Sequence, residues 1–132
     1  MLIPLLAMVA LTYGVLVHTF VGRMRAVRAG AVRLSYFRVM QGEAPDAVLA
    51  GTRHFANLFE MPVLFYAVAV LVLALDIETP ALIALAWTFV ALRVIHTFIH
   101  LTYNNVRHRL AAFAAGNICV LAMWILVAVR LL

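Results

Sequence analysis

Four long apolar stretches constrain this chain of 132 residues more than any other feature. They run roughly over 2–21, 47–75, 80–101 and 110–132. At about 1.5 Å per helical residue, each can cross the ~30 Å hydrocarbon layer of a membrane. Hydrophobic residues make up 67% of the chain and charged residues 11%, whereas soluble domains are about half apolar and a quarter charged. We therefore expect a single all-α integral membrane domain over 1–132, built as a four-transmembrane-helix bundle.

The basic residues are distributed unevenly, and all ten of them are arginine. The loop between the first two stretches carries Arg23, Arg25, Arg28, Arg33 and Arg38, and the loop between the last two carries Arg107 and Arg109. The tight loop on the opposite side carries Asp76 and Glu78. Because arginine-rich loops stay in the cytoplasm, we expect both termini to lie outside it. A nucleic-acid partner is not expected, since no soluble fold presents these arginines.

Local signals predict where the second and third helices begin. Asp46 follows a Gly- and Pro-containing break and is a candidate N-cap for the second helix. Thr79 and Pro80 place a capping hydroxyl before a first-turn proline, which is typical of a helix start. The connection between these two helices is short, so we expect them to be antiparallel neighbours.

Three polar residues lie on one face of the expected second helix. At about 100° per residue, Arg53, Asn57 and Glu60 fall within a narrow arc. Ionisable groups in hydrocarbon are costly and persist where they face a partner, a cavity or a ligand. Arg53 and Glu60 can form ion pairs with partners on other helices, bridged by Asn57. Alternatively, the cation, amide and carboxylate of this trio suit a zwitterionic, peptide-like ligand.

The third apolar stretch repeats this pattern with Arg93, His96 and His100 on one face, and Asn104 would extend the stripe if the helix continued. His96 and His100 are spaced to reach one metal or haem iron, with Glu60 as a possible third ligand. No second histidine pair or cysteine group accompanies them, so we assign no metal ligands. His54, turned away from Arg53, is interpreted as an interfacial residue.

The chain resembles the MAPEG family, the membrane-associated proteins in eicosanoid and glutathione metabolism, and within it a bacterial-type member. The helix-two signature of that family is matched by Arg53-x-x-x-Asn57-x-x-Glu60 followed by Pro62 and Phe65. The third-helix run Arg93-x-x-His96, with Arg109 further along, is similar as well. The four-helix layout, the basic first loop and the chain length extend the resemblance over the whole sequence.

The resemblance implies a homotrimer in a bacterial inner membrane, with glutathione as co-substrate held near the cytoplasmic face between adjacent protomers. The positions implied to bind glutathione are Arg53, Asn57, Glu60, Arg93, His96 and His100, with Arg28 assisting its carboxylates. Arg109 corresponds to the arginine that stabilises the reactive thiolate in the family. A nearby guanidinium raises the thiolate fraction of a thiol at neutral pH. The lipophilic co-substrate is expected to arrive laterally through the lipid bilayer.

Three positions depart from the catalytic relatives. His100 and Phe113 stand where those relatives place tyrosines, and Leu110 stands where a serine can follow the catalytic arginine. The family also includes a member that binds lipid without catalysis, so membership alone does not make this chain an enzyme. The first hypothesis is a glutathione-dependent membrane transferase or peroxidase acting on lipophilic electrophiles. The alternatives are a non-catalytic lipid-binding or scaffold protein and, third, a metal- or haem-binding protein using His96 and His100.

Overall fold

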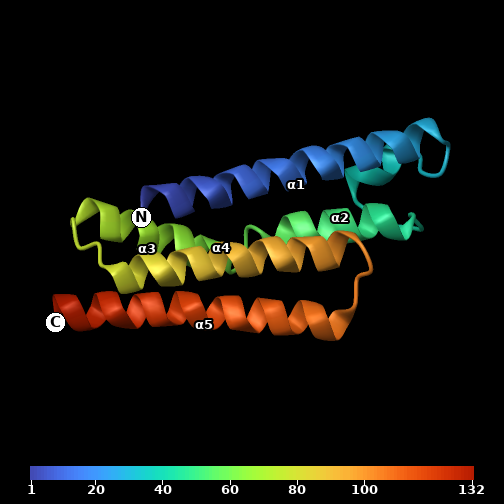
Figure 1. Cartoon of the computed structure of the whole chain (residues 1–132). Coiled ribbons are helices and arrows are strands. Elements are labelled where there is room, and N and C mark those ends of the chain that lie inside the picture. Colours follow the sequence, from blue (N-terminus) through green and yellow to red (C-terminus); the bar gives the residue numbers. More distant parts are fainter.

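The protein folds into a bundle of long antiparallel helices, seen in a computed structural model that describes all 132 residues (Figure 1). The elements are α1 (Leu2–Arg28), the short 3₁₀ helix η1 (Leu34–Arg38), α2 (Asp46–Asn57), α3 (Pro62–Ala74), α4 (Pro80–Leu101) and α5 (Val106–Leu131). Four helical segments are long and apolar enough to cross a membrane, with α2 and α3 together forming one of them. The predicted all-α fold with four spans is confirmed.

The helices run back and forth along one axis, so the ends of the bundle differ. Both termini and the α3–α4 turn lie at one end, on the left of Figure 1. The α1–α2 connection and the α4–α5 turn lie at the other end, which is the arginine-rich one. α5 packs mainly on α4, and α1 packs mainly on α2.

The helix boundaries follow the capping signals in part. α4 begins as predicted, because Thr79 Oγ1 accepts a hydrogen bond from the Leu82 amide at 3.2 Å and Pro80 occupies the first turn. Asp46 is not the N-cap of α2: Pro45 holds that position, and Asp46 is already helical. A carboxylate in the first turn still interacts favourably with the helix dipole. α1 continues to Arg28 instead of ending near Val21.

The expected second helix, 47–75, is interrupted at residues 58–61. Pro62 begins α3, and a proline has no amide hydrogen with which to continue the ladder from the Leu58 carbonyl. The Asn57 carbonyl instead accepts a long 3.4 Å bond from the Glu60 amide. The interruption therefore leaves backbone acceptors of the expected helix available to other parts of the bundle.

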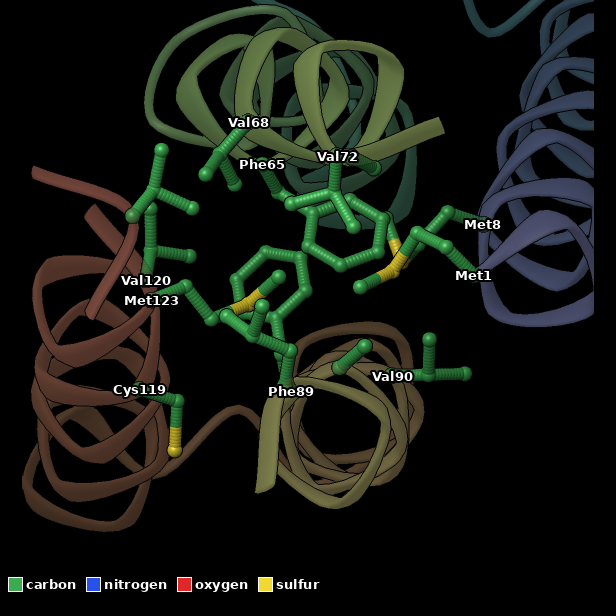
Figure 2. Close-up of a cluster of buried hydrophobic side chains, with 14 residues drawn as sticks. Met1, Met8, Phe65, Val68, Val72, Phe89, Val90, Cys119, Val120 and Met123 are labelled. Carbon is green, nitrogen blue, oxygen red and sulfur yellow. The ribbon is translucent and has the colours of Figure 1, made fainter. Parts of the chain in front are cut away.

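The apolar core lies in the half of the bundle that contains α3 (Figure 2). Phe65 of α3 and Phe89 of α4 stack at its centre, with ring centroids 4.6 Å apart. Met8 of α1 and Met123 of α5 close the core from two sides, and both are fully buried. Close packing at this end leaves the opposite half of the bundle, around α2, for polar residues.

The outer faces of the helices are apolar. Large exposed side chains occur on every long helix, for example Phe20, Val70, Phe98 and Leu121. An apolar surface of this extent needs lipid or another protein surface to cover it. This exterior fits a multi-pass protein in a lipid bilayer.

Candidate functional site

An open pocket lies between α2, α4 and α5 at the arginine-rich end of the bundle. Its volume is about 300 Å³. It is lined by Arg53, Asn57, Glu60, His96, His100, Val106, Arg109, Leu110 and Phe113. The structure thus brings the first polar stripe, the two histidines of the second stripe and Arg109 to one place within a single chain. We refer to it below as the polar pocket.

A second hollow continues from the polar pocket toward the α1–α2 connection. It measures about 410 Å³ and shares Arg53, His100 and Arg109 with the first. His18 and Asp46 lie at its far side. The two hollows together form a path along the end of the bundle with cationic side chains where they meet.

Asn57 connects α2 to the buried arginine of α4. Arg93 Nη2 donates to Asn57 Oδ1 at 2.7 Å and to the Asn57 carbonyl at 3.3 Å. Asn57 Nδ2 in turn faces Glu60 Oε2 at 3.4 Å. The backbone acceptor is available because Pro62 interrupts the helix just beyond it. The helix break and the polar stripe are therefore parts of one arrangement.

Arg93 lies behind the polar pocket and is not one of its lining residues. Its side chain is 1% exposed, and its Nε and Nη1 atoms have no hydrogen-bond partner. Its guanidinium carbon lies 6.0 Å from the centre of the Phe113 ring, a cation–π distance. A buried guanidinium with one asparagine as its partner keeps unsatisfied N–H donors. The interaction with Asn57 is consequently costly to lose.

Of the two alternatives for the first stripe, ion pairing is not seen within the chain. Arg53 and Glu60 are both exposed, and neither forms an ion pair. The one ion pair joins the Met1 ammonium to Glu78 at 2.6 Å. Arg53 and Glu60 therefore present opposite charges to the polar pocket without neutralising each other.

Arg109 is held by two side chains that precede it. Its Nη1 donates to Asn104 Oδ1 at 2.7 Å and lies 3.1 Å from His100 Nε2. α4 ends at Leu101, so Asn104 does not extend the helical stripe. Asn104 has φ of 49°, a left-handed conformation that asparagine tolerates, and it turns its amide back toward Arg109. These contacts with Asn104 and His100 hold the Arg109 guanidinium where it lines the polar pocket.

His54 is the functional candidate that the sequence reading misplaced. It is fully buried and not interfacial. Its Nδ1 lies 3.1 Å from His100 Nδ1, and its Nε2 lies 2.9 Å from Thr97 Oγ1. The signal was present in the sequence, because a histidine in an apolar stretch calls for a buried polar partner just as Arg93 does.

Three imidazoles come together at the polar pocket: His96 and His100 line it, and His54 is buried beside them. The ring nitrogens of His54, His96 and His100 lie within 4.8 Å of one another. The third member of this set is therefore His54 and not Glu60, the possible third ligand considered from the sequence. Imidazole sets of this kind bind Zn²⁺. However, the guanidinium of Arg109 is in hydrogen-bond contact with His100 and would repel a cation there. The Nδ1 atoms of His54 and His100 face each other because they share a hydrogen bond, so their closeness does not require an ion.

Arg28 is separate from this arrangement. It is exposed at the end of α1 and lines neither of the two hollows. Leu110 and Phe113, which depart from the hydroxyl-bearing residues of catalytic relatives, do line the polar pocket and give it an apolar wall.

Comparison with known proteins supports the resemblance drawn from the sequence. A family model described as the MAPEG family matches residues 1–129. No curated protein and no solved structure matches the chain. The family match covers every residue of the polar pocket, so the family assignment made from the two polar stripes is confirmed.

Proposed function

The chain belongs to the MAPEG family, and from this we propose that it is a glutathione-dependent membrane transferase or peroxidase acting on lipophilic electrophiles. Proteins of this family generally use glutathione. The observation that carries the proposal is the polar pocket, which presents a free cation, an amide, a free carboxylate and a second guanidinium from one chain.

The charges of the polar pocket complement those of glutathione. The tripeptide has two carboxylates, one ammonium group and two peptide bonds. Arg53 offers a cation for a carboxylate and Glu60 a carboxylate for the ammonium. Asn57 lies between them, and its amide suits a peptide group. The adjoining hollow of about 410 Å³ gives the tripeptide room to extend beyond Arg53 and Arg109.

Arg109 is proposed to stabilise the thiolate of bound glutathione. A guanidinium beside the sulfur favours the charged form, so the thiol releases its proton to water at the pocket mouth. The thiolate then attacks an electrophilic carbon, a carbon–sulfur bond forms, and the leaving group departs with its bonding electron pair. With a hydroperoxide, attack on the distal oxygen would instead release an alcohol and give a glutathione sulfenic acid, which a second glutathione converts to the disulfide and water.

The lipophilic co-substrate is proposed to enter from the bilayer. Val106, Leu110 and Phe113 form an apolar wall of the polar pocket on α5. The outer faces of the helices are also apolar, so a hydrophobic molecule can reach this wall without passing through water. We further propose a homotrimer in a bacterial inner membrane, with the arginine-rich end in the cytoplasm and both termini outside it.

Two matched arginine variants test the proposed function. Arg109→Ala should lower the conjugation rate with an aryl halide about 100-fold, as expected for losing two pKa units of thiol stabilisation at tenfold each. Arg107→Ala removes the same charge from the same helix at an exposed position outside the pocket, and it should leave the rate nearly unchanged. Absence of saturable glutathione binding by the purified protein in calorimetry would contradict the proposal.

The second candidate is a non-catalytic lipid-binding or scaffold protein. The observation that favours it is the apolar wall, because Leu110 and Phe113 supply no hydroxyl group to the pocket. This candidate predicts binding of a lipophilic ligand with no conjugation or peroxide reduction. Conjugation that disappears in Arg109→Ala would exclude it.

A further inference from the structure

We propose that His54 is a positioning residue that acts through His100 to hold the Arg109 guanidinium in the polar pocket. The residues involved are Arg109, His100, His54 and Thr97, which we call the histidine relay. This inference rests on the proposed function, since it concerns the orientation of the arginine that would face the thiolate. The relay itself is a structural arrangement and is testable without glutathione.

The directions of the hydrogen bonds in the histidine relay follow from its first donor. A guanidinium can only donate, so Arg109 Nη1 donates to His100 Nε2 at 3.1 Å. A neutral His100 then carries its proton on Nδ1 and donates to His54 Nδ1 at 3.1 Å. His54 must carry its own proton on Nε2, which donates to Thr97 Oγ1 at 2.9 Å. Each imidazole therefore has one defined tautomer.

The histidine relay ends on the backbone of α4. Thr97 donates its hydroxyl hydrogen to the Arg93 carbonyl at 2.8 Å. The four hydrogen bonds of the relay thus follow one another with no conflict in direction. The relay crosses from α5 to α4, to α2 and back to α4, so it fixes Arg109 relative to three helix positions.

Burial makes the histidine relay costly to break. His54 is 0% exposed and His100 is 4% exposed. A polar hydrogen left without a partner in such a place is strongly unfavourable. If His54 were replaced by an apolar residue, His100 would lose its acceptor at Nδ1. The ring would have to turn to satisfy its buried Nδ1 hydrogen, and that turn would withdraw Nε2 from the Arg109 guanidinium.

A metal ion at the three histidines would require the opposite arrangement. His54 and His100 would bind the ion through their facing Nδ1 atoms, and His100 would then carry its proton on Nε2. That hydrogen would point at Arg109 Nη1, which is itself a donor. The short Arg109–His100 contact therefore favours the relay, and metal binding becomes a distinguishable outcome of the test.

The tautomers can be measured by ¹⁵N NMR of the full-length protein labelled at histidine, without glutathione. We expect His100 to be protonated on Nδ1 in the unaltered protein, and this Nδ1 hydrogen to lose its hydrogen bond in His54→Leu, seen as an upfield proton shift and faster exchange. His54→Gln should keep the hydrogen-bonded signal, because an amide supplies both an acceptor and a donor. His108→Leu is the matched control, since His108 is exposed on α5 and contacts only Tyr103.

Kinetics provide the second measurement. His54→Leu should lower kcat for aryl halide conjugation about tenfold, equivalent to one pKa unit in the thiol. KM for glutathione should change less than about twofold, because Arg53, Asn57 and Glu60 are unaffected. His54→Gln should recover most of the rate. Thr97→Val, which removes the acceptor for His54, should reproduce part of the loss, and Thr97→Ser should not.

The outcomes separate the relay from the proposed function. Protonation of His100 on Nε2 in the unaltered protein would overturn the relay, as would an unchanged Nδ1 proton signal in a folded His54→Leu variant or a stoichiometric transition metal that this variant loses. The expected tautomers together with no glutathione binding would support the relay and overturn the proposed function. A rise in KM for glutathione as large as the fall in kcat in His54→Leu would also overturn the positioning role.

Discussion

Asn57 both holds the buried Arg93 and lines the polar pocket. Its carbonyl and its side-chain oxygen both accept from Arg93, while its amide nitrogen faces Glu60. Arg93 is buried with two of its three guanidinium nitrogens unpartnered, so it depends on Asn57 more than a fully satisfied arginine would. The same asparagine lines the pocket. One residue therefore stabilises the bundle and forms part of the proposed binding surface.

A double-mutant cycle tests the contribution of the Asn57–Arg93 pair to stability. Asn57→Leu should lower the free energy of unfolding by about 3 kcal/mol, since it leaves a buried charge with one carbonyl partner. Combining it with Arg93→Met should recover most of that loss, because both partners are then apolar. Thermal unfolding in detergent measures these differences, with Asn117→Leu on α5, outside the polar pocket, as control. Additive losses in the double variant would contradict the pairing.

The sequence predicted the members of the site better than their partners. Arg53, Asn57, Glu60, His96, His100 and Arg109 were all singled out, because polar groups in apolar stretches and their spacing along a helix are visible in the chain. Arg53 and Glu60 nevertheless form no ion pair, and His54 is buried instead of interfacial. Which side chain meets which depends on the rotation of α2 against α4, and a single sequence contains no measure of that rotation.

At the scale of elements, the break between α2 and α3 is the main difference from expectation. Hydropathy describes 47–75 as one continuous span, and by length and composition it is one. Pro62 nevertheless ends the hydrogen-bond ladder, and residues 58–61 form turns. The proline was visible in the sequence as part of the family signature. Its effect on the Asn57 carbonyl depends on Arg93 being close enough to use the freed acceptor, which required the structure.

Replacing Pro62 tests whether the break serves the polar pocket. Pro62→Ala restores an amide hydrogen for the Leu58 carbonyl, so α2 and α3 should join, and the Met61 amide should take the Asn57 carbonyl from Arg93. We expect glutathione binding to weaken about fivefold, because the hydrogen bond from Arg93 to the Asn57 carbonyl, worth roughly 1 kcal/mol, no longer holds the pocket in place. Calorimetry measures the affinity, and amide exchange at residues 58–62 reports the helix.

Pro80 provides the matched control for that change. It occupies the first turn of α4, where a missing amide hydrogen leaves no intrahelical bond unmade. Pro80→Ala should therefore alter neither glutathione affinity nor amide exchange near Asn57. Persistent turns at 58–61 in Pro62→Ala would show that packing, and not the proline, sets the break.

At the scale of the whole molecule, the apolar core and the polar pocket lie in opposite halves of the bundle. The stacked pair Phe65–Phe89 and the methionines around it fill the half with the termini. The polar pocket and the histidine relay occupy the half with the arginine-rich connections. Arg28 belongs to that half by sequence but is exposed and away from the pocket of its own chain. In the proposed homotrimer, we expect Arg28 to contribute to the pocket of a neighbouring chain.

Mixed trimers test this arrangement. Co-expressed Arg28→Ala and Arg109→Ala chains, each with little activity alone, should recover about a quarter of the normal sites, because a random cyclic trimer pairs an intact Arg109 with a neighbour's intact Arg28 in that share. Arg53→Ala mixed with Arg109→Ala should recover none, since both residues line the same pocket of one chain. Conjugation activity per trimer, with both chains quantified by distinct tags, gives the comparison. Normal activity of Arg28→Ala alone would exclude Arg28 from the site, and recovery in the second mixture would show that Arg53 and Arg109 act from different chains.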